Sequence, residues 1–398
     1  MTLHRKSSTK VRINFGGDPD PAEHSLLTDS FRLSYIGARF AACKGLGNET
    51  SRCRCGSHSV FNRRALINPG IAIANPYLAK PGEPTVRVRI GACAVTGGFI
   101  HLYSALDNRL FEKYGINPES IVVRGGGVAL AALASDEINF LYCNADANIV
   151  RIGTGADGKL LASPLIGLPY VVLARKDIKR AADLKGKSIG VTRPGDFPYR
   201  LAKEFLKKHN LSEKDVTLAT VGGTPTERYA ALLQDVFQAT LIQPPLDARG
   251  KKDGFNVIYN LNDLGLPFIY SSLFTNSRTL KERPALAQKV VAVLAEAVYF
   301  VEKKPEQAMA SVGKTLRIKD ADTLRSAYDA YAKNLINRRM IVPAKLVAET
   351  LELARQDGTV IRKKAGEIYD NVFVENLEKS GFMRELWGGA VPGDGQKP

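Results

Sequence analysis

The chain has 398 residues, of which 56 are Lys or Arg and 40 are Asp or Glu, so its formal net charge is +16. Its contents of 44% hydrophobic and 24% charged residues are those of a globular protein, which excludes a wholly disordered, collagen-like or coiled-coil chain. A chain of this length is too long for one ordinary core and predicts two lobes, or one domain with an appendage.

Residues 1–84 differ in composition from the rest of the chain. They mix Ser, Asn, Gly, Pro and Arg without a lasting apolar period, which predicts a poorly structured extension that ends in the linker-like run 80–84. No clear signal peptide is present, because the best candidate, residues 63–74, is interrupted by Asn-Pro-Gly. Cys53 and Cys55 are only one residue apart and no second pair follows, so we expect no metal site.

From residue 85 onwards, segments with the pattern of strands alternate with helical ones. This βαβαβ order predicts a parallel sheet with helices on its faces. The expected strands are 85–90, 120–123 and 138–143, and the expected helices are 97–114 and 128–133.

A second α/β unit follows residues 183–186. The start of its last helix is predicted by Thr224, Pro225 and Glu227, which match a capping box with proline in the first turn. The expected strands are 187–191, 216–221 and 239–242, and the expected helices are 197–209 and 224–234.

After an extended segment at 267–275 the chain is expected to be mostly helical. An apolar stripe runs through residues 286–301, and further helices are expected at 321–334, 343–356 and 374–379. No uninterrupted apolar run of about 18 residues occurs, so the sequence predicts no membrane-spanning segment.

Several short motifs are compatible with other functions but lack the context that those functions need. Residues 153–159 match both G-x-G-x-x-G and G-x-x-x-x-G-K, yet a strand, 160–166, is expected to follow instead of a helix, and Leu160 stands where a phosphate loop needs Ser or Thr. The run 124–127 (R-G-G-G) fits a flexible turn better than an anion-binding loop. The basic residues are scattered without interleaved aromatics, so no nucleic-acid partner is expected.

The histidines and known hydrolase motifs give no catalytic constellation. Neither G-x-S-x-G nor H-E-x-x-H occurs. His101 and His209 are expected to cap helices or to lie at the surface. We therefore expect no catalytic residue.

Residues 178–191 (I-K-R-A-A-D-L-K-G-K-S-I-G-V) resemble the segment that opens the second lobe of solute-binding proteins of ABC importers. The closest resemblance is to the branch that binds nitrate, sulfonates, taurine and thiamine pyrimidines. Further segments resemble parts of that family in the same order, namely 110–116, 227–234, 239–245, 264–267 and 304–308. The resemblance covers residues 85–382.

The resemblance implies a two-lobed α/β fold of the periplasmic-binding-protein type, with a doubly wound sheet in each lobe and a largely helical C-terminal part. Lobe 1 would comprise residues 85–175 and 268–398, and lobe 2 residues 176–267. It also implies a monomer without cofactor, periplasmic or at the cell surface and peripheral to the membrane. Such a protein delivers a small ligand, anionic or heterocyclic, to an ABC importer permease.

Ligands of such sheets bind beyond the carboxyl ends of the strands. In the first lobe these positions are Cys93, Thr96, Gly97, Gly98, Phe99, Tyr142, Asn144 and Ala145, and in the second lobe Arg193, Gly195, Asp196, Phe197, Thr224, Pro225, Gln243 and Pro244.

Each of these positions has a chemical role to offer. The backbone N–H groups of residues 96–98 could donate to an anionic or carbonyl oxygen. The guanidinium of Arg193 could bind an acidic group with two parallel N–H donors. The rings of Tyr142 and Phe197 either form a flat apolar contact with a ligand or belong to the ordinary packing of their lobes. Asn144 and Gln243 would orient a ligand by hydrogen bonds. Asp196 is expected to cap its helix.

Cys93 and Cys143 follow strands that are neighbours in this fold. A disulfide between them needs Cα atoms closer than about 7 Å. Two buried thiols are the favoured expectation.

Two alternative functions stay open on the same scaffold. The first is an enzyme like thiamine-pyrimidine synthase, a branch that uses pyridoxal phosphate, a reactive His and a cysteine cluster. That cluster does not occur in this sequence. The second is a ligand-sensing module.

Overall fold

The computed structural model describes residues 75–221, 223–266 and 268–393. All elements below belong to one compact unit, Pro69–Pro398. Most of the extension expected at residues 1–84, including Cys53, Cys55 and the signal-peptide candidate, lies outside the described residues.

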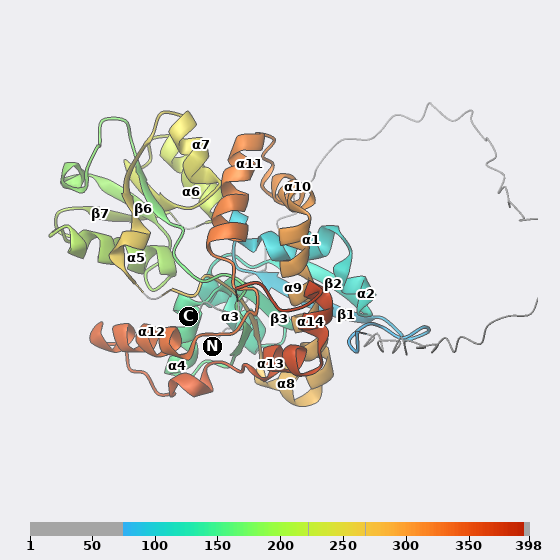
Figure 1. Cartoon of the computed structure of the whole chain (residues 1–398). Coiled ribbons are helices and arrows are strands. Elements are labelled where there is room, and N and C mark those ends of the chain that lie inside the picture. Colours follow the sequence, from blue (N-terminus) through green and yellow to red (C-terminus); the bar gives the residue numbers. More distant parts are fainter. Residues whose placement is uncertain (1–74, 222, 267, 394–398) are drawn as a thin grey trace, which may run out of the picture. The chain divides into compact units, whose positions relative to one another are not determined.

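The first sheet has five strands in the order β2-β1-β3-β10-β4 (Figure 1). β1 pairs in parallel with β2 and β3, whereas β10 runs antiparallel to β3 and β4. The alternating V-R-V-R-I sequence of β1 buries Val88 and Ile90 and leaves Arg87 exposed, as a strand period of two requires. The bounds are β1 Val86–Ala92, β2 Ile116–Val122, β3 Phe140–Asn144, β4 Lys159–Ala162 and β10 Ser271–Thr275.

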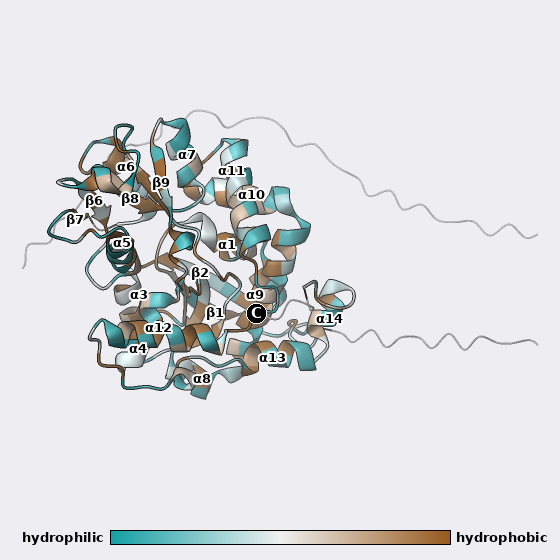
Figure 2. Cartoon of the chain, turned by 60° about the vertical axis from the view of Figure 1, so that its left-hand side comes forward, coloured by the Kyte–Doolittle hydropathy of each residue, from teal (hydrophilic) through white to brown (hydrophobic). Residues whose placement is uncertain are grey.

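The second sheet repeats this topology in the order β7-β6-β8-β5-β9. β6 is parallel to β7 and β8, and β5 is antiparallel to β8 and β9. In Figure 2 the strands of this sheet are largely brown, whereas the visible turns of α5 are teal. The bounds are β5 Val171–Ala174, β6 Ser188–Val191, β7 Thr217–Thr220, β8 Ala239–Ile242, β9 Asn256–Asn260, α5 Phe197–Lys208, α6 Pro225–Leu233 and α7 Leu246–Lys252.

The two sheets give the two-lobed α/β fold that the sequence predicted. The expected boundary at 175/176 differs from the sheet membership, because β5 pairs with β8 and β9 of the second sheet. The chain therefore enters the second lobe before Val171. Below, "first lobe" and "second lobe" denote the elements that pack with the first and second sheet.

The remaining helices belong mostly to the first lobe. α1 packs on α9 and α10, while α4 packs on α3 and α12. α11 continues directly into a π-helix, Asp329–Asn334. The two segments together cover the helix expected at 321–334. The bounds are α1 Ile100–Asp107, α2 Leu110–Lys113, α3 Gly126–Ala134, α4 Asp146–Thr154, α8 Ser277–Glu282, α9 Pro284–Lys303, α10 Pro305–Leu316, α11 Ala321–Tyr328, α12 Ala344–Gln356, α13 Val372–Lys379 and α14 Phe382–Trp387.

α9 carries the predicted apolar stripe. Leu286, Val290, Leu294, Val298 and Val301 are all buried. By length and hydropathy alone α9 is the one helix among the described residues that reaches the threshold for crossing a membrane, but most of it is buried against other helices of this lobe. It is therefore a core helix.

Three local predictions have clear outcomes. The capping box is present, since the Thr224 hydroxyl accepts a bond from Glu227 N at 3.3 Å and the Glu227 carboxylate accepts one from Thr224 N at 2.6 Å. The glycine-rich run 153–159 leads from α4 into β4, with no helix after it, as expected. The prediction for His101 is wrong, because this side chain is fully buried and burial lowers its pKa to about 3.

Candidate functional site

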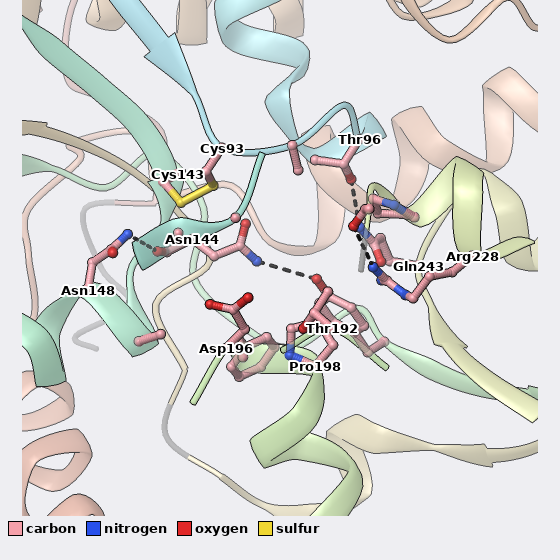
Figure 3. A pocket seen from close by; sticks show the side chains of 18 residues that line it. Cys93, Thr96, Cys143, Asn144, Asn148, Thr192, Asp196, Pro198, Arg228 and Gln243 are labelled. Atoms are coloured by element: carbon pink, nitrogen blue, oxygen red, sulfur yellow. Dashed lines mark hydrogen bonds between the residues drawn. A yellow bond between two sulfur atoms is a disulfide. The ribbon is translucent and has the colours of Figure 1, made fainter. Parts of the chain in front are cut away.

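A cavity of about 70 Å³ lies between the two sheets, beyond the carboxyl ends of β1, β3, β6 and β8 (Figure 3). This is the edge at which open α/β sheets bind ligands. One ordered water needs roughly 10–15 Å³, so the cavity has room for a small molecule. Both lobes contribute to its lining.

The structure brings part of the expected site together around this cavity. Cys93, Thr96, Asn144, Asp196, Phe197, Pro225 and Gln243 line it. The other expected positions lie outside the lining, namely Gly97, Gly98, Phe99, Tyr142, Ala145, Arg193, Gly195, Thr224 and Pro244. Residues outside the expected set of binding residues complete it: Ala94, Gly125, Gly126, Cys143, Ala147, Asn148, Tyr170, Thr192, Pro198, Gly223 and Arg228.

Cys93 and Cys143 form a disulfide, with Cα atoms 5.3 Å apart, in the wall of the cavity. The expectation of two buried thiols was therefore wrong. The strand register explains the contact: Ala92 is the partner of Tyr142, so the next residue of each parallel strand faces its counterpart. Disulfides are typical of proteins in oxidising compartments.

The loop after β1 contacts the second lobe through a short chain of hydrogen bonds. Gln243 Nε2 donates to Thr96 Oγ1 at 2.8 Å, and this hydroxyl also lies 3.3 Å from Tyr270 Oη. Two of the three backbone N–H groups expected to be free for a ligand are already used, because Thr96 N donates to Tyr103 Oη and Gly98 N to Thr96 Oγ1. This loop therefore offers side chains to the cavity more than backbone donors.

The two glycines after Thr96 serve packing instead of ligand contact. A Cβ on Gly97 would lie 2.8 Å from Pro244 O, and one on Gly98 would lie 2.0 Å from the Tyr270 ring. The Pro244 carbonyl also accepts a bond from Tyr331 Oη at 2.8 Å. Only glycine allows so close an approach, so these positions hold the loop against neighbouring segments.

Aromatic rings are divided between the core and the cavity. Tyr142 is buried outside the lining and meets Phe99 edge-on with ring centres 5.1 Å apart, which is ordinary packing. Phe197 lines the cavity, stacks on Phe268 at 4.2 Å and meets Tyr170 edge-on at 5.4 Å. Phe197 also lines a second cavity of about 300 Å³, so its ring forms a shared wall.

Asn144 and Asn148 are held by each other and by Tyr170. Asn144 Nδ2 donates to Tyr170 Oη at 3.4 Å, and Asn148 Nδ2 donates to the Asn144 carbonyl at 3.1 Å (Figure 3). Asn148 Oδ1 is left buried without a hydrogen-bond partner.

Two largely buried ion pairs cross between the lobes, from α4 to the start of α5. Arg151 lies 3.0 Å from Asp196, and Arg200 lies 2.7 Å from Asp146. Asp196 occupies the N-cap position of α5 but makes no capping bond, so its expected role as a cap was wrong. Burial raises the pKa of Asp146, and Arg200 and then Arg151 oppose that rise. These pairs hold the two lobes against each other.

Arg228 is the cation that the sequence expectation missed. It extends from α6 into the cavity lining with only 1% exposure, and its Nη1 and Nη2 donate to the carbonyls of Gly223 at 3.2 Å and Leu241 at 3.4 Å (Figure 3). Burial lowers its pKa. Arg193, the expected cation for an acidic group, lies outside the lining and donates to the Arg124 carbonyl at 3.4 Å.

A signal for Arg228 is present in the sequence. The buried positions of α6 are Pro225, Arg228, Tyr229 and Leu232, so the arginine occupies a place in the inward stripe of the helix. An arginine in such a stripe is rarely buried without a partner, which makes it a candidate for binding.

Among the described residues no group of three or more His, Cys, Asp or Glu gathers in a way that fits a metal ion. The two histidines in this part of the chain, His101 and His209, do not line the cavity. The lining therefore supplies hydrogen-bonding groups, the guanidinium of Arg228, the carboxylate of Asp196 and aromatic surface.

Comparison with known proteins agrees with this architecture. A candidate binding protein of Brucella abortus (strain 2308) is 26% identical over 73% of this chain and 84% of its own length. A candidate ABC transporter periplasmic binding protein of Brachyspira hyodysenteriae is 24% identical over 51% of this chain and 62% of its own.

Among solved structures, the alkanesulfonate-binding protein of Xanthomonas axonopodis pv. citri bound to MOPS shares the fold. Its TM-score is 0.61 at 19% identity, and the match covers 73% of this chain and 99% of that one. The family model described as NMT1/THI5 like matches residues 97–308, more than half of the chain. The protein is thus a member of the NMT1/THI5-like family, as its resemblance to ABC-type solute-binding proteins implied.

Proposed function

We propose that this protein is an extracytoplasmic solute-binding protein that captures a small molecule between its lobes and delivers it to an ABC importer. One observation carries the proposal: four polar atoms in residues lining the cavity are buried without a partner. They are Asn148 Oδ1, Thr192 Oγ1, Arg228 Nε and Gln243 Oε1. Buried polar atoms in native proteins are nearly always hydrogen-bonded, so a bound solute is the natural partner.

Lobe closure around the solute would be the mechanism. A ligand that contacts Asn148 of the first lobe and Thr192 of the second favours the closed state by its contacts to both. The bond from Gln243 to Thr96 and the crossing ion pairs stabilise the same state. Permeases that accept only the closed form would then couple release to transport.

The location proposed is the periplasm or the cell surface. One relative of this chain, from Brachyspira hyodysenteriae, is named as a periplasmic binding protein, and a disulfide in the cavity wall suits an oxidising compartment. The site does not favour the alternative enzyme, because the described histidines do not line the cavity.

The test is a binding screen on the purified protein by thermal unfolding and calorimetry. Sulfonates, nitrate, pyrimidines and aromatic acids form the panel. A ligand present at 100 times its Kd stabilises the folded state by about 2.7 kcal/mol, which raises Tm by several degrees. Reconstitution with the permease encoded nearest in the genome then separates a transport receptor from a sensor. Absence of any shift, together with absence of any retained ligand, would contradict the proposal.

A further inference from the structure

We propose that the solute is a small monoanion, a carboxylate or sulfonate, whose acid group binds the guanidinium of Arg228. This inference rests on the proposed function and concerns the same cavity. It depends on the burial of Arg228, on its partners, and on the charges around it.

Arg228 lacks a counterion. Among the described residues no Asp or Glu lies within ion-pair distance of its guanidinium, which donates instead to the backbone carbonyls of Gly223 and Leu241. Its Nε has no partner. A fully buried cation that is not paired is costly, and such groups are normally paired or bound to a ligand.

The nearby carboxylates already have partners. Asp196, the one carboxylate in the described lining, is bound to Arg151, and Glu227 both caps Thr224 N and pairs with Arg124 at 3.0 Å. Each of these acids is therefore balanced by its own arginine. The charge left over in the cavity is the single positive charge of Arg228, which one negative charge on a ligand neutralises.

The surroundings of Arg228 suit an acid group better than a neutral heterocycle. Thr192 Oγ1 is buried without a partner, and a hydroxyl can donate to an anionic oxygen beside the guanidinium. At the beginning of α6 the N–H groups of Thr224 and Glu227 are already bonded within the capping box, and Pro225 has no N–H to offer. The arginine side chain, not the helix terminus, therefore supplies the anion site.

The rest of the cavity limits the body of the ligand. Tyr170, Phe197 and the disulfide of Cys93 with Cys143 form an apolar wall. The cavity volume of about 70 Å³ allows only a short apolar part beyond the acid group. A doubly charged phosphate would leave one charge unpaired in this site.

Matched pairs of acids and amides test the inference. Acetate is compared with acetamide, benzoate with benzamide, and methanesulfonate with methanesulfonamide, by calorimetry on wild type, Arg228→Met and Arg193→Met. We expect at least one acid to bind wild type while its amide does not. Loss of one partner of a buried charge pair predicts binding at least ~30-fold weaker for Arg228→Met. Arg193→Met, a matched change at an arginine outside the lining, should bind within a few-fold of wild type.

Fold stability separates a binding role from a structural one. Since Arg228 is an unpaired buried cation, Arg228→Met should unfold at a temperature equal to or above that of ligand-free wild type. If Arg228→Met fails to fold, Arg228→Lys replaces it in the test, because lysine keeps the positive charge but cannot pair with an acid group through two parallel N–H donors. This variant should bind the acid more weakly than wild type and still distinguish the acid from its amide.

The outcomes distinguish the two proposals. Equal binding of acid and amide, with no effect of Arg228→Met, would overturn the anion inference and leave solute binding intact. A neutral or cationic compound extracted from purified wild type and retained equally by Arg228→Met would do the same. No binding of any compound and no retained ligand would count against solute binding itself. Because carboxylates and sulfonates are tested separately, the acid that binds also identifies the acid group of the solute.

Discussion

The pair of Asp146 and Arg200 provides a direct test of how the lobes are held closed. Asp146 begins α4 of the first lobe, Arg200 lies on α5 of the second, and the bonded atoms are 2.7 Å apart. Asp146 is 8% exposed, and the Arg200 side chain is 23% exposed. The change Arg200→Met keeps much of the apolar stem but leaves a buried carboxylate without its bonded cation.

The expected cost follows from this burial. Breaking a fully buried ion pair by removing one partner costs about 3–5 kcal/mol. Because Arg200 is partly exposed and Arg151 also stabilises the Asp146 carboxylate, we expect about 2 kcal/mol here. Opening of the lobes hydrates Asp146 and relieves this cost, so the loss falls on the closed state. Ligand binding should therefore weaken on the order of 30-fold.

Calorimetry with the ligand found in the screen measures this effect. The double variant Asp146→Asn, Arg200→Met removes the buried charge as well and should recover most of the lost affinity. Arg87→Met is the matched control, because its pair with Glu119 spans 2.8 Å but is exposed, and such pairs contribute roughly 0–1 kcal/mol. Wild-type affinity in Arg200→Met, or a double variant as weak as the single one, would refute this account of closure.

Three further predictions concern stability. Thr224→Ala removes the capping bond of α6 and should lower the free energy of unfolding by about 1 kcal/mol, measured by urea titration; an unchanged midpoint would contradict the cap. Replacing Cys93 and Cys143 by Ser removes a cross-link between residues that are 50 apart in the sequence. Under oxidising conditions the double variant should lose up to about 4 kcal/mol of its free energy of unfolding, whereas under reducing conditions it should match wild type. Burial lowers the pKa of His101 from 6.5 to about 3, so the unfolded chain binds a proton that the folded one does not. Stability should then fall as pH drops from about 6.5, by up to about 1.4 kcal/mol per unit, and His101→Leu should flatten that slope.

Much of the fold could be predicted from local patterns. The alternation in β1, the stripe of α9 and the capping box of α6 are each fixed by residues close together in the chain. The expected boundary at residue 175 missed β5, because a strand of four residues carries little periodicity and its sheet is decided by distant partners. Pairing across the sheet is a property of the tertiary structure.

The site was predicted less completely, for the same physical reason. Asp196 occupies the N-cap position that its sequence context suggested, but the nearby Arg151 from the other lobe binds its carboxylate. Arg193 follows a strand end and yet lies outside the cavity, whereas Arg228 reaches it from the first turns of a helix. Strand ends identify the right edge of a sheet, but which side chains enter the cavity depends on how the lobes meet.

The most direct test of the central claim is a crystal structure of the protein with its ligand bound. The account predicts density for the ligand between the lobes, with an acid group on Arg228 and contacts to Asn148 and Thr192 from opposite lobes. A ligand bound elsewhere, or one that contacts a single lobe, would contradict it.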